Sequence, residues 1–419
     1  MNTIPNCWLD RFLSLIRPVL HSAGFCGLIL GAFLHVAIQN AGAVQFSISD
    51  RATFTNLINT NAVFTTNGSV SSKIEGPVWI PNGQYLVFSD MANNKLKKLV
   101  PPGTFTDFFV PALTKTIYNG NYLDLQERQI SCLCGSNGLA VVMTTNGVAT
   151  PLVTTCNNLK FYSPNDLTVK SDGSIWFTDP GWDSGLPLPP PSGSSVPSGF
   201  QTGLYVYRFY ETNGNGTAAV MTTNVAKPNG ICFSPDETRL YVSDNGISGN
   251  SGRVIVFNVT SSNTLTGSNL FCTVSQGIAD GLRCDVNGNL WVASGDGVEI
   301  YAPDGHLIGK IVFISTSNLC FGGSGYKTIY MTAAPNVCSF PVLIAGAVSN
   351  KKLTVSAAGT NVCVSWPAPS TGFGLQKSDS LGCGAGWSGV TDPVGVTNGL
   401  NQLGVTPTNA AKFYRLLLN

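Results

Sequence analysis

The stretch SPNDLTVKSDGSIWFTDPGW, from Ser163 to Trp182, contains two short apolar runs joined by a Ser-Asp-Gly turn. Short apolar runs separated by such a turn predict a pair of strands. The polar pair Asn165-Asp166 directly precedes the first run, although a sheet disfavours both residue types. The presence of polar residues at the start of a strand pair therefore requires an explanation. The same pattern recurs along the rest of the chain.

Strand endings similar to SIWFTD recur along the chain. They fall at Asp90, Cys134, Asp179, Asp244, Ser294 and Ala333, separated by 44, 45, 65, 50 and 39 residues. This period is typical of the blades of a β-propeller. The long step contains a segment rich in Pro, Gly and Ser, residues 182–203, which is interpreted as an insertion and a candidate lid. The sequence therefore predicts an all-β fold, with a six-bladed β-propeller over residues 44–342.

A polar residue lies 14 or 15 positions before each strand ending. These residues are Glu75, Asn119, Asn165, Asn229, Asp280 and Asn318. Turn formation explains one such residue, but six in register favour a shared polar site, because equivalent positions in a ring of blades surround one axis.

Carboxylate and amide oxygens are ligands that suit Ca²⁺. Glu75 and Asp280 would balance the charge of a divalent cation, and Mg²⁺ or Mn²⁺ could take the same donors. The sequence has no cluster of His and Cys typical of a zinc site. A Ser-His-Asp or Cys-His arrangement would need His306, which lies in the predicted outer turn APDGHLIG. Since no P-loop or dinucleotide fingerprint is present, metal-assisted hydrolysis is the remaining scheme.

The composition excludes one class of partner. The chain has 419 residues, of which 11% are charged, and a formal net charge of +1. A nucleic-acid-binding protein needs a basic surface, so none is expected here.

The first 43 residues predict a signal peptide. Arg11 and Arg17 precede the apolar run GFCGLILGAFLHVAI, and Ala41-Gly42-Ala43 has the small-x-small form of a cleavage site. The run is short for a membrane span, and a retained signal anchor is the alternative. We expect a secreted or periplasmic protein, with no stable membrane insertion after removal of residues 1–43.

Ten cysteines follow residue 43, and in an exported protein they could form disulfides. Cys363 and Cys383 are a plausible pair, whereas Cys132 and Cys134 point to the same strand face and should not bond each other.

Two other sets of residues are given structural roles. The strand-end acids Asp90, Asp179 and Asp244 are expected to act in turns or caps, and Trp79, Trp176 and Trp291 to pack between blades.

The two ends of the mature chain have separate predictions. Residues 44–73 should supply a strand to the last blade and close the ring, because closure removes exposed edges. Residues 343–351 are predicted to be a linker, and residues 352–419 a small β-sandwich-like module that contacts a cell surface or glycan, or is a passive folding cap.

The motifs EGPVW, SPNDLTVKSDGSIWFTDPGW, KPNGICFSPDETRLYVSD, DGLRCDVNGNLWVAS, IYAPDG and NLCFGG together resemble the gluconolactonase, regucalcin and luciferin-regenerating-enzyme family. The resemblance covers residues 44–341 and implies a six-bladed propeller that hydrolyses lactones with calcium or zinc. It also implies that Glu75, Asn229 and Asp280 bind the metal, that Asn165 lies beside metal and substrate, and that Asp280 is the general base. The family's second-blade histidine is missing from the stretch SCLCGS, so substrate range or rate can differ.

The resulting hypothesis is a hydrolase that opens a sugar lactone such as glucono-δ-lactone. Its metal ligands are Glu75, Asn165, Asn229 and Asp280, its catalytic base is Asp280, and Asn119 and Asn165 bind substrate. Two alternatives stay open: an organophosphate or other lactone hydrolase at the same site, and a calcium-stabilised sugar-binding protein without turnover. Measured turnover separates the second alternative from the other two.

Overall fold

The computed structural model describes residues 44–111, 117–134, 141–145, 148–188, 196–212, 215–348, 353–368, 370, 373–380, 385–397, 400–407 and 411–418. The predicted signal peptide, residues 1–43, lies outside this range. The described chain is all-β, with one short helix, α2 (Arg51–Leu57), and two 3-10 turns, η1 (Met91–Asn93) and η2 (Ser324–Tyr326). Within the described residues, no helix has the length and apolar character needed to cross a bilayer.

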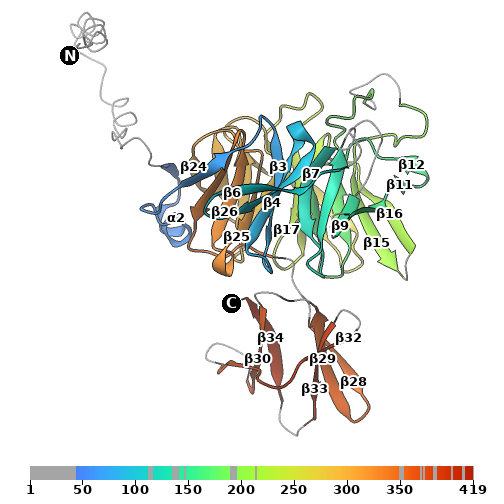
Figure 1. The fold of residues 1–419 in the computed structure, drawn as a ribbon, viewed down its shortest axis with the longest axis vertical. Helices are drawn as coiled ribbons and strands as arrows, with labels where there is room; N and C mark the ends of the chain where they lie inside the picture. The colour runs from blue at the N-terminus through green and yellow to red at the C-terminus, as the bar shows by residue number, and fades with distance from the viewer. Residues whose placement is uncertain are drawn as a thin grey trace, which may run out of the picture. The chain divides into compact units, whose positions relative to one another are not determined.

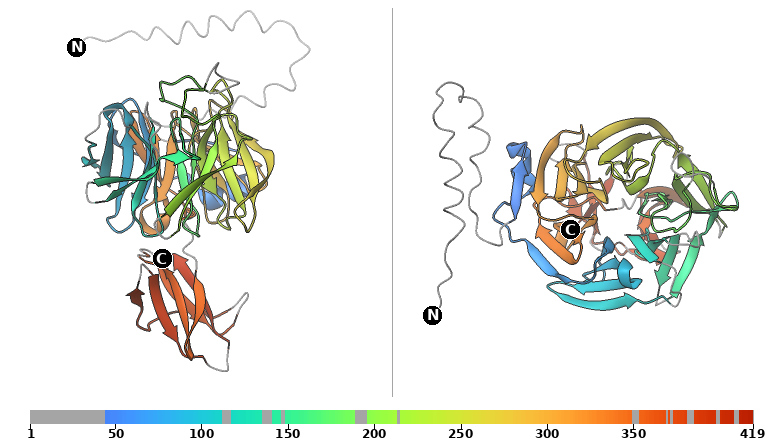
Figure 2. Two further views of the ribbon diagram at one scale, coloured as in Figure 1. Left: turned by 90° about the vertical axis from the view of Figure 1, so that its right-hand side faces the viewer. Right: turned by 90° about the horizontal axis from the view of Figure 1, so that it is seen from above.

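Six antiparallel sheets built from described residues follow one another along the chain and lie around a common centre (Figures 1 and 2). Their strands, in chain order, are β3–β6 (Ile74–Ile80, Tyr85–Asp90, Lys95–Val100, Thr104–Phe109), β7–β10 (Ile117–Leu123, Gln129–Cys134, Val141–Thr145, Val148–Val153), β13–β16 (Leu167–Val169, Ile175–Thr178, Val206–Thr212, Asn215–Thr222), β17–β20 (Pro228–Phe233, Arg239–Asp244, Arg253–Val259, Leu265–Thr273), β21–β24 (Leu282–Cys284, Leu290–Ser294, Gly297–Tyr301, Leu307–Val312) and β25–β27 (Asn318–Gly322, Thr328–Ala333, Asn336–Pro341). A small separate hairpin is formed by β11 (Thr155–Cys156) and β12 (Leu159–Lys160). The recurring strand endings are therefore second strands of their sheets.

The first strands of the six sheets form the inner ring. Each contacts the first strand of the next sheet, in the order β3, β7, β13, β17, β21, β25 and again β3. The polar residues predicted from the repeat lie at or just before the starts of these strands. They are consequently brought to the same end of the inner ring.

Residues 163–182 form the predicted hairpin. β13 and β14 pair antiparallel, and Leu167 lies opposite Phe177. Gly173 has a φ of 85°, which suits glycine, and its amide donates to the carbonyl of Lys170. Asn165 lies two residues before β13, and its backbone amide donates to the carbonyl of Thr178 at 2.8 Å.

The N-terminal described segment closes the ring as predicted. β2 (Thr65–Ser69) pairs with β27 and becomes the fourth strand of the last sheet. An additional strand, β1 (Gln45–Ile48), pairs with β24 and was not predicted. Between them α2 begins at Asp50, whose carboxylate accepts a hydrogen bond from the Thr53 amide, and it buries Phe54 against the last two sheets.

Aromatic side chains pack the sheets against one another, which confirms the prediction for the three tryptophans. Trp176 meets Phe233 of the next sheet edge-on with ring centroids 5.3 Å apart, and Trp291 meets Phe321 in the same way. Trp79 stacks on Tyr330 of the preceding sheet. These contacts bury large apolar areas between neighbouring sheets.

The cysteines that the structure describes are free, and most of them are buried. Cys132 and Cys134 do not bond each other, as expected. Cys383 lies outside the described residues, so its proposed pairing with Cys363 stays a prediction.

The C-terminal residues form two further sheets. Their strands are β28 (Thr354–Ala358), β29 (Asn361–Pro367), β33 (Leu400–Val405) and β32 (Gly395–Thr397) in one sheet, and β31 (Ser388–Gly389), β30 (Phe373–Ser378) and β34 (Phe413–Leu418) in the other. Trp366 and Leu403 of the first sheet share an apolar cluster with Leu375 of the second. The two sheets thus have a small core of their own.

Candidate active site

One cavity collects the polar residues that the repeat predicts. It has a volume of about 220 Å³ and is lined by Lys73, Glu75, Met91, Asn119, Asn165, Trp182, Asp183, Asn229, Ile278 and Asp280. All five predicted site residues are therefore brought together. Asn318 is not part of this lining, and its side-chain oxygen accepts a hydrogen bond from the amide of Leu319.

Glycines next to the site residues allow the inner strands to approach closely. A Cβ atom at Gly76 would lie 2.3 Å from the carbonyl oxygen of Asn119, and one at Gly230 would lie 2.2 Å from that of Asp280. Both distances are far below van der Waals contact, so only glycine fits without movement of the neighbouring backbone. This steric demand explains why the motifs EG, NG and DG accompany the site residues.

Hydroxyl groups hold the backbone of the site residues from the neighbouring sheet. Ser89 donates to the carbonyl of Asn119, Thr178 to that of Asn229, and Ser243 to that of Asp280, each at 2.6 Å. Each hydroxyl residue directly precedes a strand-end acid. These residues were not predicted from the sequence, although the repeated Ser-Asp or Thr-Asp pair was a usable signal.

The strand-end acids cap backbone amides, as predicted. Asp179 accepts hydrogen bonds from the amides of Tyr162 and Ser163, at 2.7 and 2.6 Å. Asp244 accepts from the amides of Lys227 and Gly246, and Asp90 caps η1. None of the three lines the cavity, which agrees with a structural role.

Glu75 and Asp280 are buried acids in one electrostatic environment. Burial raises the pKa of Glu75 to about 7, and its backbone hydrogen bond to Gly76 only partly opposes this. Burial and the nearby charge of Glu75 raise the pKa of Asp280 well above its usual value. Among the described residues, neither carboxylate has an ion-pair partner within 4.0 Å, and the charge of Lys73, which lines the same cavity, only partly opposes the rise in their pKa values.

Asp166, which follows the predicted ligand Asn165, has a cationic partner. Its Oδ2 lies 3.2 Å from Nη1 of Arg283, and both side chains are buried. The negative charge of Asp166 contributes to the raised pKa values of Glu75 and Asp280. Arg283 balances the charge of Asp166, whereas Glu75 and Asp280 have no cationic partner within 4.0 Å among the described side chains. This ion pair was not predicted from the sequence.

Asn245 fixes the orientation of the Asn229 amide. The Asn245 Nδ2 donates to the carbonyl of Ala279 at 2.7 Å, so its Oδ1 must face Asn229. Nδ2 of Asn229 donates to that oxygen at 2.8 Å. One N–H of the Asn229 amide is therefore bound to Asn245, and the amide also forms a hydrogen bond with the carboxylate of Asp280. The Oδ1 of Asn229 is the acceptor that remains for a cation.

The mouth of the cavity is formed partly by the predicted insertion. Asp183 pairs with Lys73 at 2.7 Å, and Nζ of Lys227 lies 3.3 Å from the centroid of the Trp182 ring. Trp182 and Asp183 line the cavity, so the start of the insertion borders the site. Residues 189–195 lie outside the described range, and the lid stays a prediction.

Two candidate nucleophilic schemes are not supported by the geometry. His306 lies in the turn between β23 and β24, half exposed, beside Asp304, and does not line the cavity. Cys134, in the stretch where the family histidine was expected, is buried, and burial raises its pKa to about 12. A thiol with that pKa is not an activated nucleophile.

The donor set suits a hard divalent cation. Two buried carboxylates without a cationic partner and an amide oxygen oriented by Asn245 are oxygen ligands of the kind that Ca²⁺ accepts. In the described part of the chain there is no group of three His, Cys, Asp or Glu side chains suited to a metal. A site here would accordingly depend on amide oxygens as well as on the two acids.

Comparisons with known proteins identify the family of this all-β chain. Residues 74–335 match the family described as "SMP-30/Gluconolactonase/LRE-like region". A gluconolactonase from Zymomonas mobilis is 29% identical over 293 residues, which cover 63% of this chain and 76% of that protein. The structure of a gluconolactonase from Xanthomonas campestris has a TM-score of 0.62 and 28% identity, covering 73% of this chain and 99% of that one.

A regucalcin from Agrobacterium tumefaciens, described as a calcium-binding protein, has a TM-score of 0.52 and 18% identity, covering 69% of this chain and 96% of that one. This likeness concerns the fold alone.

The chain belongs to the SMP-30/gluconolactonase/LRE-like family, as the sequence motifs indicated. Its gluconolactonase and lactonase relatives identify it as a lactone hydrolase.

Proposed function

We propose that this protein is a secreted or periplasmic, metal-dependent hydrolase that opens a sugar lactone similar to glucono-δ-lactone. The observation that carries the proposal is the convergence of Glu75, Asn119, Asn165, Asn229 and Asp280 on one cavity. We further propose that the six sheets are the blades of a propeller over residues 44–342, with the cavity on its axis. Residues 343–351 would then be a linker, and residues 352–419 a separate β module that contacts a cell surface or glycan.

In this proposal Glu75, Asn165, Asn229 and Asp280 hold the cation, with Ca²⁺ the preferred ion. When bound, such an ion polarises the lactone carbonyl and lowers the pKa of water. Charge balance supports a divalent ion, because the two carboxylates otherwise lie buried without a cationic partner within 4.0 Å among the described side chains.

Asp280 is proposed to take the proton of the attacking water, since a buried carboxylate with a raised pKa is a competent base near neutral pH. Water oxygen bonds to the carbonyl carbon, the ring C–O bond breaks, and the ring oxygen takes up a proton. The product is an aldonic acid, which releases its proton to solvent. Asn119 and Asn165 line the cavity, and we propose that their amides bind sugar hydroxyls.

Apolar side chains in the cavity favour acyl lactones as a second class of substrate. Met91, Trp182 and Ile278 line it together with the polar residues. An acyl lactone, with an alkyl chain against these side chains, is therefore the second candidate substrate.

The test is acid release from glucono-δ-lactone and from an acyl lactone, measured by pH-stat against the spontaneous rate. The purified protein is assayed with calcium, with chelator and with calcium restored. Chelator-sensitive release that returns with calcium supports the proposal, and the ratio of the two rates identifies the substrate class. Binding of calcium without any release above background would contradict it and favour a non-catalytic binding protein.

A further inference from the structure

A second pocket lies at the other end of the inner strands. Two of the inner strands connect the cavity to this pocket: β3 carries Glu75 and then Trp79, and β21 follows Asp280 and carries Arg283. The pocket has a volume of about 90 Å³, and its lining shares no residue with the cavity described above.

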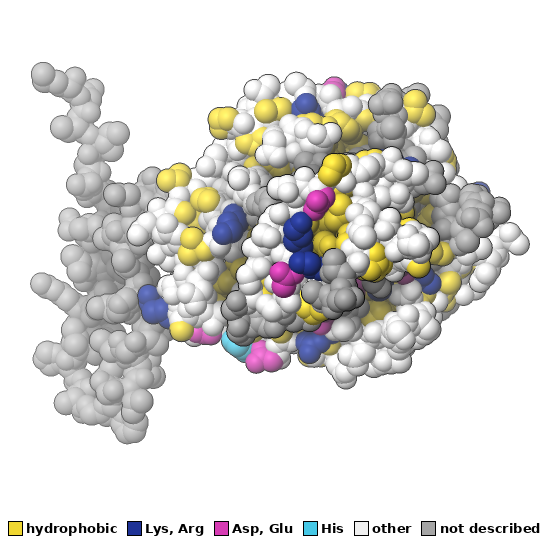
Figure 3. All heavy atoms as spheres, turned by 90° about the horizontal axis from the view of Figure 1, so that it is seen from below, with side chains coloured by type: hydrophobic (Ala, Val, Ile, Leu, Met, Phe, Trp, Pro, Cys, Tyr) yellow, Lys and Arg dark blue, Asp and Glu magenta, His cyan; other side chains and the backbone are white. Residues whose placement is uncertain are grey.

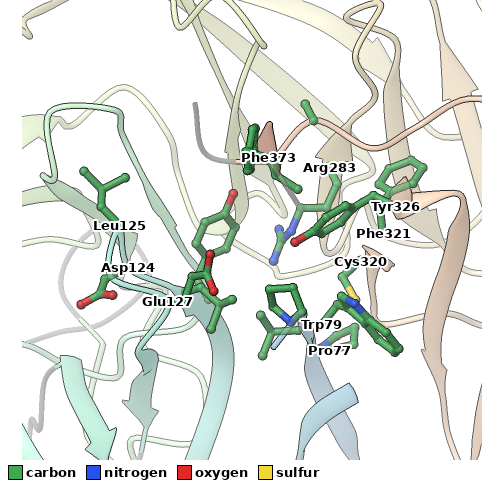
Figure 4. A pocket seen from close by; sticks show the side chains of 16 residues that line it. Pro77, Trp79, Asp124, Leu125, Glu127, Arg283, Cys320, Phe321, Tyr326 and Phe373 are labelled. Carbon is green, nitrogen blue, oxygen red and sulfur yellow. The ribbon is translucent and has the colours of Figure 1, made fainter. Parts of the chain in front are cut away.

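The walls of this second pocket are mostly apolar. Side chains of Pro77, Leu125, Phe321 and Tyr326 contribute to them (Figure 4). Figure 4 shows the guanidinium of Arg283 reaching into the middle of the pocket, with Trp79 on one side and Glu127 on the other.

Two buried N–H donors in this lining have no acceptor among the described residues. They are Nη2 of Arg283 and Nε1 of Trp79. Arg283 is 6% exposed and Trp79 is 5% exposed, so bulk water does not solvate either group freely. A buried donor without a partner is unfavourable, and a hydrogen bond to a ligand oxygen would remove this cost.

The remaining contacts of both residues hold them in place. Nη1 of Arg283 donates to Asp166 at 3.2 Å and to the carbonyl of Leu282 at 2.7 Å, and the guanidinium lies over the ring of Tyr122. The Trp79 ring is stacked on Tyr330 with centroids 5.3 Å apart. The guanidinium and the indole are therefore held in fixed orientations. Both N–H groups are buried in the pocket wall, so a ligand oxygen reaches them only with a small movement of neighbouring side chains.

We propose that this pocket binds a short branched monocarboxylate, of the size of isobutyrate or isovalerate, whose carboxylate accepts from Arg283 Nη2 and Trp79 Nε1. Charge-assisted hydrogen bonds from a guanidinium favour a carboxylate over a neutral acceptor. The volume limits the ligand to a small apolar body, since an engineered cavity that holds benzene has about 150 Å³. Glu127 in the same lining opposes the ligand's charge and should keep the affinity modest.

The experiment uses the full purified chain labelled with ¹⁵N-tryptophan. Isobutyrate is titrated while the indole N–H resonances are followed, and affinity is measured by calorimetry. The Trp79 resonance, assigned with Trp79→Phe, should shift. Trp176 is an internal control, because its Nε1 already donates to Ser174 at 3.0 Å and should not respond.

Variants and neutral analogues test the chemistry. Trp79→Phe should weaken isobutyrate binding about tenfold, which corresponds to one hydrogen bond. Glu127→Gln should strengthen it several-fold, and isobutyramide and gluconate should both bind at least about tenfold more weakly than isobutyrate. An unmoved Trp79 resonance at saturating isobutyrate would overturn the proposal, as would isobutyramide binding as tightly as the acid. Lactone hydrolysis is not part of this readout, so failure here is distinct from failure of the proposed function.

Discussion

At the scale of single residues, Glu75 is the most direct test of the proposed cation site. Glu75→Gln keeps the shape of the side chain and removes its charge. We expect calcium affinity, measured by calorimetry, to fall at least about tenfold, because one of two charged ligands is lost. Lactone hydrolysis should fall with it.

Glu237→Gln is the matched control for Glu75→Gln. Glu237 accepts from Ser171 and pairs with Lys170 at 3.3 Å, outside the cavity lining. Unchanged calcium affinity in Glu75→Gln, with normal folding, would remove Glu75 from the site.

A variant of Asn245 shows how strongly calcium affinity depends on a residue that orients a proposed ligand. Asn245→Leu removes the acceptor that holds Nδ2 of Asn229, so the amide is free to rotate and present its nitrogen to the cavity. Loss of such a supporting hydrogen bond typically costs about 10–100-fold in metal affinity. Calcium titration of the purified variant measures this directly.

The stability loss in that variant needs its own control. Asn289→Leu also removes a buried amide, one that donates to Asp285 at 2.8 Å, but it lies away from the cavity. Both variants should lose about 1–3 kcal/mol of unfolding free energy, and only Asn245→Leu should lose calcium affinity. Equal affinities in the two variants would show that Asn245 is merely structural.

At the scale of elements, second strands position the site through their hydroxyl residues. Ser243→Ala removes the hydrogen bond from β18 to the Asp280 carbonyl of the next sheet. We expect kcat for the lactone to fall several-fold with a stability loss of about 1 kcal/mol, because the backbone that carries the proposed base is less constrained. Comparing kcat and KM in Ser243→Ala and Ser234→Ala checks this, since Ser234 serves a remote turn. Equal effects on kcat would contradict the positioning role.

The N-terminal strand is the second element that can be tested. Deleting residues 44–73 removes β1, α2 and β2, and it leaves β27 with an unpaired edge. We expect the shortened protein to unfold at a much lower temperature and to aggregate. The deletion exposes the edge of β27 and also the apolar residues against which Phe54 packs. A shortened protein with the same melting temperature would contradict the closing role.

At the scale of the whole molecule, the buried acids link stability to pH and to calcium. The pKa of Glu75 is raised from 4.5 to about 7, so the native state holds a proton more tightly than the unfolded state. Metal-free protein should therefore be most stable below about pH 4.5 with respect to this group, and should lose up to about 3 kcal/mol as the pH rises to 7. Asp280, with its pKa raised by burial, acts in the same direction.

Calcium should reverse this loss, because it binds the ionised acids only in the folded state. A concentration one hundred times the Kd adds about 2.7 kcal/mol. Melting curves with chelator and with calcium, at pH 5 and pH 8, measure both effects. A chelated protein that melts at a higher temperature at pH 8 than at pH 5 would argue against buried, uncompensated acids.

On the face drawn in Figure 3, several Lys and Arg side chains lie close to Asp and Glu side chains.

The sequence by itself determined the repeat, the strand endings and the register of the polar residues. These follow from local rules, since apolar runs, turn residues and a fixed period are all visible in one dimension. The repeat alone identifies six polar residues, and the fold brings five of them to one cavity, all but Asn318. The sequence motifs also indicated the family to which the chain belongs.

Only the tertiary structure decided which groups support that cavity. The Asp166–Arg283 ion pair joins residues 117 positions apart, and the hydroxyl of Ser243 reaches Asp280 in the next sheet. The orientation of the Asn229 amide depends on its hydrogen bond with Asn245. Strand β1 forms because it pairs with the edge strand β24 and becomes the fifth strand of that sheet. Such contacts arise from the closing of the ring, which sets distances between strands that no local pattern contains.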